Sequence, residues 1–438
     1  MSISGISILR TVDVDFYRNL TRLGEIPGAL DVSNQVDAIL SEVQKGGDRS
    51  VVALTNRLDG LSANALSDLE VSQDRMRAAV EHLDPLVAGA LTSAIVRVRR
   101  YHEEQKRALG DQVDWSFEDA EGNQLGQIVR GMKRIGVYAP GGKAAYPSTV
   151  IMTVVPARVA EVGEVLLTVP APGGEISDVL LAAASLAGVD RVFTIGGAQA
   201  IAAMAYGTET IPQVDKIVGP GNLYVATAKQ RVFGVVGIDM MAGPSEVVIV
   251  ADDSANADWL VMDMFAQAEH DEMAQSILIS SSDTLLTEVD RRIDEQLSAM
   301  SRAEIIQNSI LSRGALIHVR DQEEAIRIVN QLAPEHLELA VANPDKVLTQ
   351  VSAAGAIFLG HHAGEVVGDY TAGPSHVLPT SRSARFASPL GVYDFQVRSS
   401  VVQCSARGAV GLSRDAAILA EAEGLTAHAA SARLRVQG

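Results

Sequence analysis

Ile135-Gly136-Val137-Tyr138-Ala139-Pro140-Gly141-Gly142 is a short apolar run that ends in a proline and two glycines. The run has the length of a buried strand, and a glycine pair lets the backbone approach a ligand closely. A helical pattern follows from about Ser148, so the stretch predicts strand, turn and helix in succession. Two later glycine turns, at 195–199 and 219–222, also follow short strands. Such turns fit a crevice binding site on an open parallel sheet, although glycines also end strands without any ligand.

The chain beyond residue 113 repeats this alternation of strands and helices. Short β-branched runs are separated by alanine-rich helical patterns, which favours βαβ units and a largely parallel sheet in two successive lobes. The predicted strands are 135–138, 164–169, 191–194, 216–218, 246–251, 276–280, 315–319 and 356–359.

The two ends of the chain lack this alternation. Residues 13–108 read as mostly helical, with one helix ending near Gly46-Gly47 and a long helix starting at Asp84-Pro85. Beyond Pro379 the strand pattern lapses, and two further helices are predicted at 414–422 and 427–435. The sequence therefore predicts an α/β fold with two Rossmann-like parallel-sheet domains, a helical N-terminal region and a small C-terminal appendage.

Composition limits the kind of partner. The 438 residues carry a net charge of −18, which argues against nucleic acid, although backbone N–H groups can still bind an anionic cofactor. No apolar run approaches the roughly 20 residues of a membrane span, and the N-terminus is too short and polar for a signal peptide. A cytosolic protein is expected. The single cysteine, Cys404, lies outside every cluster that suggests chemistry and is expected to be inert.

No nucleotide-binding fingerprint is present. The chain has neither a GxGxxG motif nor a Walker A loop, and the nearest match, 136–143, has glycine at the expected lysine position.

Gln267-Ala268-Glu269-His270 suggests a metal site. It lies at the end of a helix predicted over 253–271, where Gln267 and His270 are three residues apart and share a face. Asp271 competes with Gln267, because a neutral amide is an uncommon zinc ligand. The alternative is a helix end at which His270 only offsets the helix dipole.

Two further candidates lie far along the chain. Asp369 falls in a predicted loop, 368–376, after the last strand, where it could be a functional carboxylate or a turn residue. His428 is a lone histidine, which is more often structural than a ligand. The remaining histidines, including His361-His362, have no partner that the sequence identifies.

Glu335-His336 suggests an acid–base pair. Neighbouring residues of a strand point to opposite faces, so both can serve one pocket only if the backbone turns, as Pro334 allows. His336 is the natural general base because its free pKa lies near neutrality, and Glu335 could activate water or orient the imidazole. A solvated turn is the alternative. Together with the ligand candidates, the pair suggests a metal-assisted enzyme.

Assembled in order, these motifs closely resemble those of the histidinol dehydrogenases. Thr371, Ser375 and Pro389 depart from the family's usual residues, and they cast little doubt on the chemistry. The matching segments are 136–142, 146–149, 196–200, 219–222, 242–247, 267–271, 333–337, 368–380 and 423–428.

The resemblance implies a zinc-dependent oxidation of L-histidinol through the aldehyde to L-histidine, the end of histidine biosynthesis, with two NAD consumed. Carried over to matching positions, the catalytic residues would be Glu335 and His336, and one zinc per subunit would be held by Gln267, His270, Asp369 and His428. Substrate contacts would add Ser245 and Glu423 to Gln267, His270, His336, Asp369 and His428. Cofactor contacts would be Tyr138, Gln199 and Asn222.

The resemblance also implies an aldehyde-dehydrogenase-like fold and an intertwined homodimer in which Glu423 and His428 complete the partner's site. The alternatives are a related enzyme acting on another small alcohol such as sulfopropanediol, a zinc hydrolase that needs no NAD, and an inactive binding module. The expected parts are an N-terminal helical arm at 1–24, a domain of 25–133 and 245–385 with the metal and catalytic residues, an NAD-binding domain at 134–244, and a C-terminal segment at 386–438.

Overall fold

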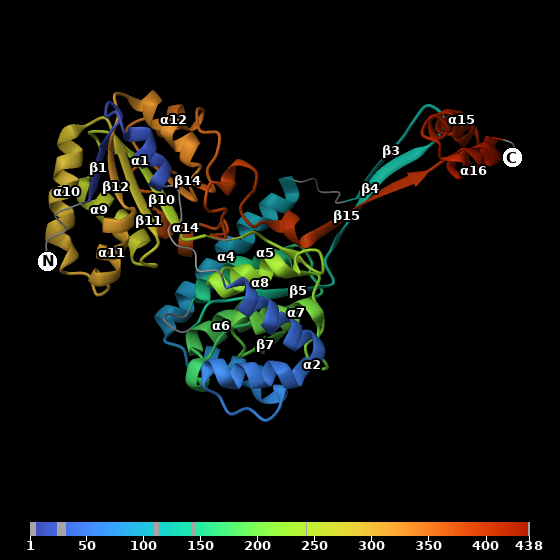
Figure 1. The fold of residues 1–438 in the computed structure, drawn as a ribbon, viewed down its shortest axis with the longest axis horizontal. Helices are drawn as coiled ribbons and strands as arrows, with labels where there is room; N and C mark the ends of the chain where they lie inside the picture. Colours follow the sequence, from blue (N-terminus) through green and yellow to red (C-terminus); the bar gives the residue numbers. More distant parts are fainter. Residues whose placement is uncertain (1–5, 24–31, 109–113, 142–145, 242, 437–438) are drawn as a thin grey trace.

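The computed structural model describes residues 6–23, 32–108, 114–141, 146–241 and 243–436. These residues form two bodies, each built on a six-stranded sheet, and an arm that projects from them (Figure 1). The predicted α/β class with two parallel-sheet domains is confirmed. Within the described residues, no single helix is long and apolar enough to cross a membrane, although one bent pair of helices meets that test by length and composition.

The first body contains the opening sequence stretch at the centre of its sheet. The strand order is β2-β7-β6-β5-β8-β9, and every pair is parallel except β2 with β7. Because β5 pairs with β6 on one side and β8 on the other, the chain reverses its winding direction there. The strands are β2 (Glu70–Val71), β5 (Arg134–Tyr138), β6 (Glu164–Thr168), β7 (Arg191–Phe193), β8 (Lys216–Val218) and β9 (Gly237–Ile238).

In the described part of the chain, seven helices surround this sheet, and three of them come from the N-terminal region. Helix α2 packs on α7, α3 on α6 and α4 on α5, and their apolar residues join the two cores of this body. The predicted grouping of 25–133 with 245–385 is therefore wrong for these helices, because their buried faces belong with 134–238. The helices are α2 (Ser33–Asp59), α3 (Gln73–Glu81), α4 (Pro85–Ala108), α5 (Pro147–Val159), α6 (Asp178–Ala187), α7 (Gly197–Tyr206) and α8 (Leu223–Val232), with the short 3-10 turns η1 (Leu66–Leu69) and η2 (Pro172–Gly174).

Helix α2 continues past the point where the sequence predicts its end. Gly47 has a φ of +52°, so the helix kinks there and then resumes to Asp59. A glycine tolerates that φ, and a Cβ atom at Gly47 would meet the carboxylate of Glu209. The Gly46-Gly47 pair therefore bends the helix instead of ending it.

The second body is a fully parallel sheet of order β1-β12-β11-β10-β13-β14. The N-terminal segment is not only a helical arm, because β1 pairs with β12 at the sheet edge and Phe16 of α1 is buried in this core. Its strands are β1 (Ser7–Arg10), β10 (Glu246–Ala251), β11 (Gln275–Ser280), β12 (Ala315–His318), β13 (His336–Ala340) and β14 (Ala356–Leu359). Its helices are α1 (Phe16–Leu23), α9 (Ala257–Ala268), α10 (Asp283–Leu297), α11 (Ala303–Arg313), α12 (Gln322–Leu332), α13 (Pro344–Leu348) and α14 (Glu365–Tyr370).

The arm is an antiparallel ribbon that ends in a helical hairpin (Figure 1). Its strand order is β15-β4-β3, and β15 pairs with β4 along its full length. The expectation that strands end beyond Pro379 is wrong, because β15 follows it. The strand was missed because it is exposed along most of its length, so its sequence shows no alternation of buried and exposed residues. The arm comprises β3 (Trp115–Glu118), β4 (Gln124–Gly131), β15 (Gln396–Gln403), α15 (Ala406–Ala422) and α16 (Thr426–Val436); η3 (Ser383–Arg385) and η4 (Val392–Phe395) precede β15.

Candidate active site

Helix α9 brings Gln267 and His270 to the amino edge of the second sheet. The helix is shorter than predicted: Asn256 caps its start, and it ends at Ala268, so His270 lies just beyond it. Gln267 is fully buried, and neither polar atom of its side chain has a hydrogen-bond partner among the described residues. An unpaired buried amide costs about 1–3 kcal/mol, so this side chain is suited to a ligand.

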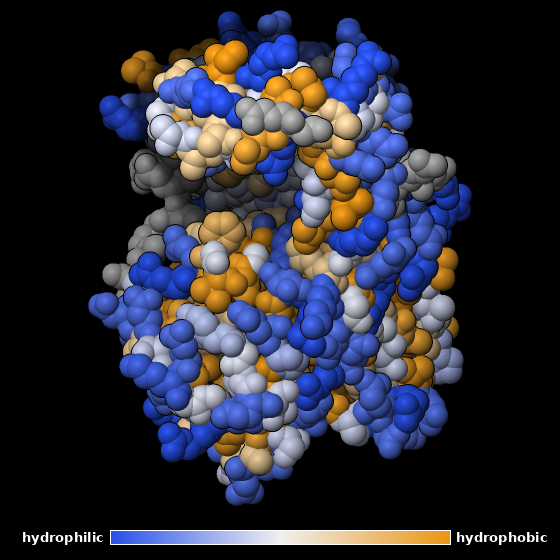
Figure 2. Space-filling view, turned by 90° about the vertical axis from the view of Figure 1, so that its right-hand side faces the viewer, coloured by the Kyte–Doolittle hydropathy of each residue, from blue (hydrophilic) through white to orange (hydrophobic). Residues whose placement is uncertain are grey.

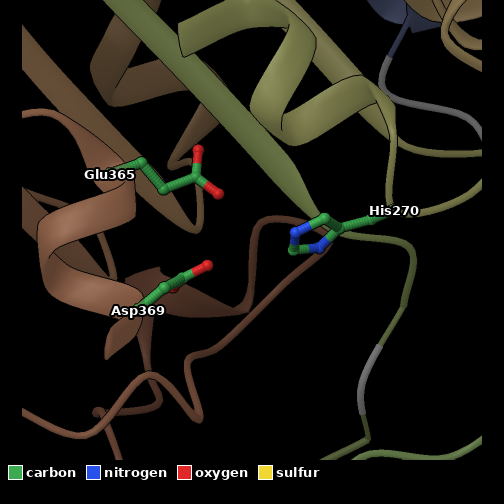
Figure 3. Close-up of side chains that lie close together, drawn as sticks. All are labelled: His270, Glu365 and Asp369. Carbon is green, nitrogen blue, oxygen red and sulfur yellow. The ribbon is translucent and has the colours of Figure 1, made fainter. Parts of the chain in front are cut away.

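Asp369 lies on a helix, which corrects the expectation of a loop. Helix α14 turns back from the end of β14 and carries Glu365 and Asp369 four residues apart, on one face. Their carboxylates point toward His270 (Figure 3), and one ligand atom from each of the three residues lies within 4.8 Å of the others. Sequence reasoning missed Glu365, although its i, i+4 spacing to Asp369 would have identified it had a helix been predicted there.

The backbone of Glu246 holds both members of the Glu335-His336 pair. Ala333 has a left-handed φ of +45° after α12, and β13 then starts at His336, so the chain bends where a shared pocket requires it. The Glu246 N–H donates to Glu335 Oε2 at 2.9 Å, and His336 Nδ1 lies 3.0 Å from the Glu246 carbonyl oxygen. Both side chains are buried.

These contacts assign the proton on the His336 ring. Because a carbonyl oxygen only accepts, Nδ1 must donate to Glu246, and Nε2 is left 3.7 Å from Asp369 Oδ1. His336 Nε2 has no hydrogen-bond partner among the described residues. The ring is thus oriented through one nitrogen, and the other faces the cluster.

The site is rich in buried charge. Burial opposes the charged form of His336, but Glu365 and Glu335 outweigh it and raise the pKa of the ring well above its usual value. Burial raises the pKa of Glu335 to about 8 and that of Glu365 well above its usual value. Burial lowers the pKa of His270, which favours the neutral imidazole that binds metals. Such a set of acids and neutral imidazoles suits a divalent cation.

His376 belongs to the same site, although no sequence pattern predicted it there. Its Nδ1 lies 3.8 Å from Asp369 Oδ1, and burial lowers the pKa of its ring. The spacing from Asp369 spans the end of a helix and the segment after it, so no periodic pattern connects the two. The same segment contacts the first body, where Ser375 Oγ donates to the carbonyl of Met152 on α5 at 3.0 Å.

The described residues of the three glycine turns lie at the carboxyl edge of the first sheet, and Gly142 of the first turn lies outside the described residues. Tyr138 ends β5, and its hydroxyl accepts from the N–H of Gly197 in the second turn at 3.2 Å. Gln199 in that turn is buried, and its Oε1 has no hydrogen-bond partner among the described residues. Asn222 in the third turn caps α8 by accepting from Val225 N–H. The three predicted cofactor residues therefore line one edge of the sheet.

The third turn is held by a buried ion pair. Gly219 N–H donates to Asp239 Oδ2 at 2.7 Å, and Lys229 Nζ donates to the Gly219 carbonyl at 3.0 Å and pairs with Asp239. Gly219 has a φ of +107°, and a Cβ atom there would lie 2.1 Å from the carbonyl oxygen of Tyr138. The backbone of Gly219 therefore packs against that of Tyr138 so closely that only glycine fits at position 219.

Of the remaining predicted substrate and metal residues, Ser245 lies near the site, and Glu423 and His428 lie on the arm. Ser245 directly precedes Glu246 at the amino end of β10, beside the acid–base pair. Glu423 and His428 are exposed on the helical hairpin of the arm, away from the cluster of their own chain (Figure 1). One chain therefore brings together Gln267, His270, Glu335, His336 and Asp369 but not Glu423 or His428. Cys404 is exposed on the arm.

This arrangement is that of a two-domain α/β oxidoreductase, with glycine turns on one body and the buried Glu335-His336 pair on the other. A sequence model of the family described as histidinol dehydrogenase matches residues 27–436. The chain belongs to the histidinol dehydrogenase family.

Curated relatives support this membership over the whole chain. A histidinol dehydrogenase of Dechloromonas aromatica (strain RCB) is 53% identical over 434 residues, which cover 99% of each protein. One of Pseudomonas aeruginosa is 53% identical over 98% of this chain and 97% of its own length. The crystal structure of histidinol dehydrogenase from Elizabethkingia anophelis matches with a TM-score of 0.92 at 31% identity, covering 100% of this chain and 99% of that one.

Proposed function

We propose that this chain oxidises L-histidinol through L-histidinal to L-histidine in histidine biosynthesis, with one zinc per subunit and two NAD consumed. The observation that carries the proposal is the cluster of His270, Glu365 and Asp369 beside an acid–base pair that is oriented by the backbone of Glu246. Family membership supplies the substrate.

The proposed zinc ligands are Gln267, His270, Asp369 and His428 of the partner subunit. The buried, unpaired amide of Gln267 and the ligand atoms gathered around His270 fit such an ion. Bound zinc would orient the imidazole and amino nitrogens of histidinol and offset the charge of the buried carboxylates. Glu365 adds a carboxylate to the same cluster.

His336 is the proposed base for the alcohol. Its Nδ1–H is fixed on the Glu246 carbonyl, and only Nε2 can exchange a proton with the substrate. Zinc would offset the charge of the carboxylates that raise the pKa of the ring, so that a neutral Nε2 could take the hydroxyl proton while the carbon loses hydride. NAD, bound near Tyr138, Gln199 and Asn222, would accept that hydride. Burial keeps bulk water from the ring and from the aldehyde that forms.

Glu335 is the proposed base for the second half of the reaction. Its carboxylate is held by the Glu246 N–H, and a pKa near 8 lets it exchange protons close to neutral pH. It would take a proton from the water that attacks the aldehyde, which gives a hydrate. Loss of a second hydride and a proton from the hydrate yields the carboxylic acid. One water and two NAD are consumed per histidinol.

A homodimer with shared sites is part of the proposal. The hairpin of the arm carries Glu423 and His428 and also exposes large apolar side chains, which Figure 2 shows on the arm side of the molecule. An exposed apolar surface of this kind is typical of an interface. The exposed residues are Leu412, Ile418, Leu419, Leu425 and Leu434.

The test is the stoichiometry of NADH formed per L-histidinol consumed by the purified chain. We expect two NADH, loss of activity with a chelator, and recovery with added zinc. Product formation without NAD would instead indicate a hydrolase, and oxidation of another small alcohol but not histidinol would indicate a different substrate.

A further inference from the structure

Strand β13 and helices α9 and α14, which carry residues of the site, also contact one another through side chains outside the cluster. Strand β13 carries His336 and, two residues later, Glu338, so both side chains lie on the same face of the strand. Helix α9 carries Gln267 and, one turn earlier, Asp263 on the same face of the helix. Helix α14, which carries Asp369, begins directly after Gly364.

The contacts at this junction join all three elements. The N–H of Glu365, the first residue of α14, donates to Glu338 Oε1 at 2.6 Å. The side chains of Glu338 and Asp263 hydrogen-bond to each other. Gly364, directly before α14, packs against Asp263 of α9. A Cβ atom at Gly364 would lie 3.0 Å from Asp263 Oδ1.

This contact requires a proton on one of the two carboxyl groups. Two carboxyl groups can share a hydrogen bond only when one of them carries a proton. Glu338 is 3% exposed, so its carboxyl group has little access to water and depends on these two partners. A neutral Glu338 can accept from Glu365 N–H through one oxygen and donate to Asp263 through the other.

We propose that Glu338 and Asp263 are positioning residues that set the spacing between α9 and α14, and hence between Gln267 and the Glu365–Asp369 pair on either side of the cation site. Neither carboxyl group belongs to the cluster itself. The effect on zinc rests on the proposed function, whereas the link between the elements does not.

The test compares two substitutions in the full-length chain, Glu338→Gln and Glu338→Leu. Glutamine keeps an oxygen that accepts from Glu365 N–H and an N–H that donates to Asp263, whereas leucine fills the volume without either bond. The measurements are hydrogen exchange of the Glu365 amide in metal-free protein and zinc affinity by competition with a chelating dye. The matched control is Glu324→Leu, which removes another buried carboxyl group of this body, one that contacts Thr11 and Arg320.

Glu338→Gln is expected to keep the Glu365 amide protected and to bind zinc within about threefold of the unsubstituted chain. Glu338→Leu is expected to lose that protection and to weaken zinc binding by about 10- to 100-fold, the range for residues that support metal ligands. Glu324→Leu is expected to lower the melting temperature while zinc affinity stays unchanged.

Unchanged protection and affinity in Glu338→Leu would overturn the proposal, as would a loss in Glu338→Gln as large as that in Glu338→Leu. If the leucine variant does not fold, the glutamine variant decides alone: retained protection supports the proposal, and lost protection refutes it. If the unsubstituted chain binds no zinc, the proposed function fails, and the exchange measurement still tests the link.

Discussion

One ring nitrogen of His336 is hydrogen-bonded to the backbone, which orients the ring in the site. Its Nδ1–H donates to Glu246, and its Nε2 faces Asp369 at 3.7 Å without a hydrogen-bond partner among the described residues. A ring fixed in this way loses little freedom when it takes a proton, which is the advantage of a preorganised base.

His336→Ala is predicted to lower kcat by about 10²- to 10⁴-fold, the contribution of a general base, while zinc stays bound. The ring is not among the proposed ligands, so metal content should match that of the unsubstituted chain. Steady-state rates and metal analysis on the same preparation check both parts. Activity close to normal would remove His336 from the mechanism.

His270→Ala is predicted to lose zinc and activity together, with zinc affinity reduced by more than about 100-fold because a direct ligand matters more than its supports. His362→Ala is the matched control, since His362 lies on the surface against Trp259 and is not part of the cluster. Full zinc occupancy in His270→Ala would refute the ligand assignment.

The residues of the site could be predicted from the sequence to different extents. Glu335-His336 and Gln267/His270 are close in the chain, so local spacing indicated that each pair could act together. Asp369 joins them only because the parallel sheet and α14 bring it there, and that required the family resemblance. Glu365 was missed because no helix was predicted at α14, and His376 because no periodic pattern links it to Asp369. The roles of all these residues stay predictions.

At the scale of elements, the buried strands were the most predictable part. All eight predicted strands correspond to observed ones, since each is apolar and bounded by turns. Strand β15 was missed because its side chains are exposed on both faces, and α14 was read as a loop because Gly368 and Gly373 suggest turns. Packing partners were the least predictable: α2 to α4 join the first body, which only their contacts reveal.

The third glycine turn gives a prediction at this scale. Gly219→Ala should raise the KM for NAD by at least about tenfold, because the new Cβ would collide with the carbonyl oxygen of Tyr138, 2.1 Å away, and displace a proposed cofactor residue. Steady-state kinetics with varied NAD measure this change.

Gly234→Ala is the control for backbone strain alone. Gly234 has a φ of +99°, close to that of Gly219, but its two chain neighbours apart, no atom of the described residues lies within 4 Å of its ideal Cβ position. Both variants should lose about 1–2 kcal/mol of stability from the left-handed φ. An equal rise in the KM for NAD in both variants would contradict the role assigned to the contact between Gly219 and Tyr138.

At the scale of the whole molecule, the main question is whether the arm completes the active site of a second copy of the chain. The arm carries Glu423 and His428 on an exposed hairpin, and it exposes apolar residues of the kind that typically form interfaces (Figure 2). A second copy that receives the arm would bring His428 to Gln267, His270 and Asp369. This exchange would make each active site depend on two chains.

Complementation between inactive variants tests this exchange. His336→Ala and His428→Ala should each be inactive as homodimers, whereas refolding an equal mixture should restore about one quarter of normal activity, because half of the dimers are mixed and each has one intact site. If the site were built within one chain, both sites of a mixed dimer would carry a defect and the mixture would stay inactive.

The most direct test of the whole account is a crystal structure of the zinc-loaded chain with L-histidinol, with the metal located by anomalous scattering at the zinc edge. We predict zinc within about 2.3 Å of Gln267, His270, Asp369 and His428 of the partner subunit, with His336 uncoordinated and directed at the substrate hydroxyl. Zinc bound elsewhere, or coordinated by His336, would contradict the account.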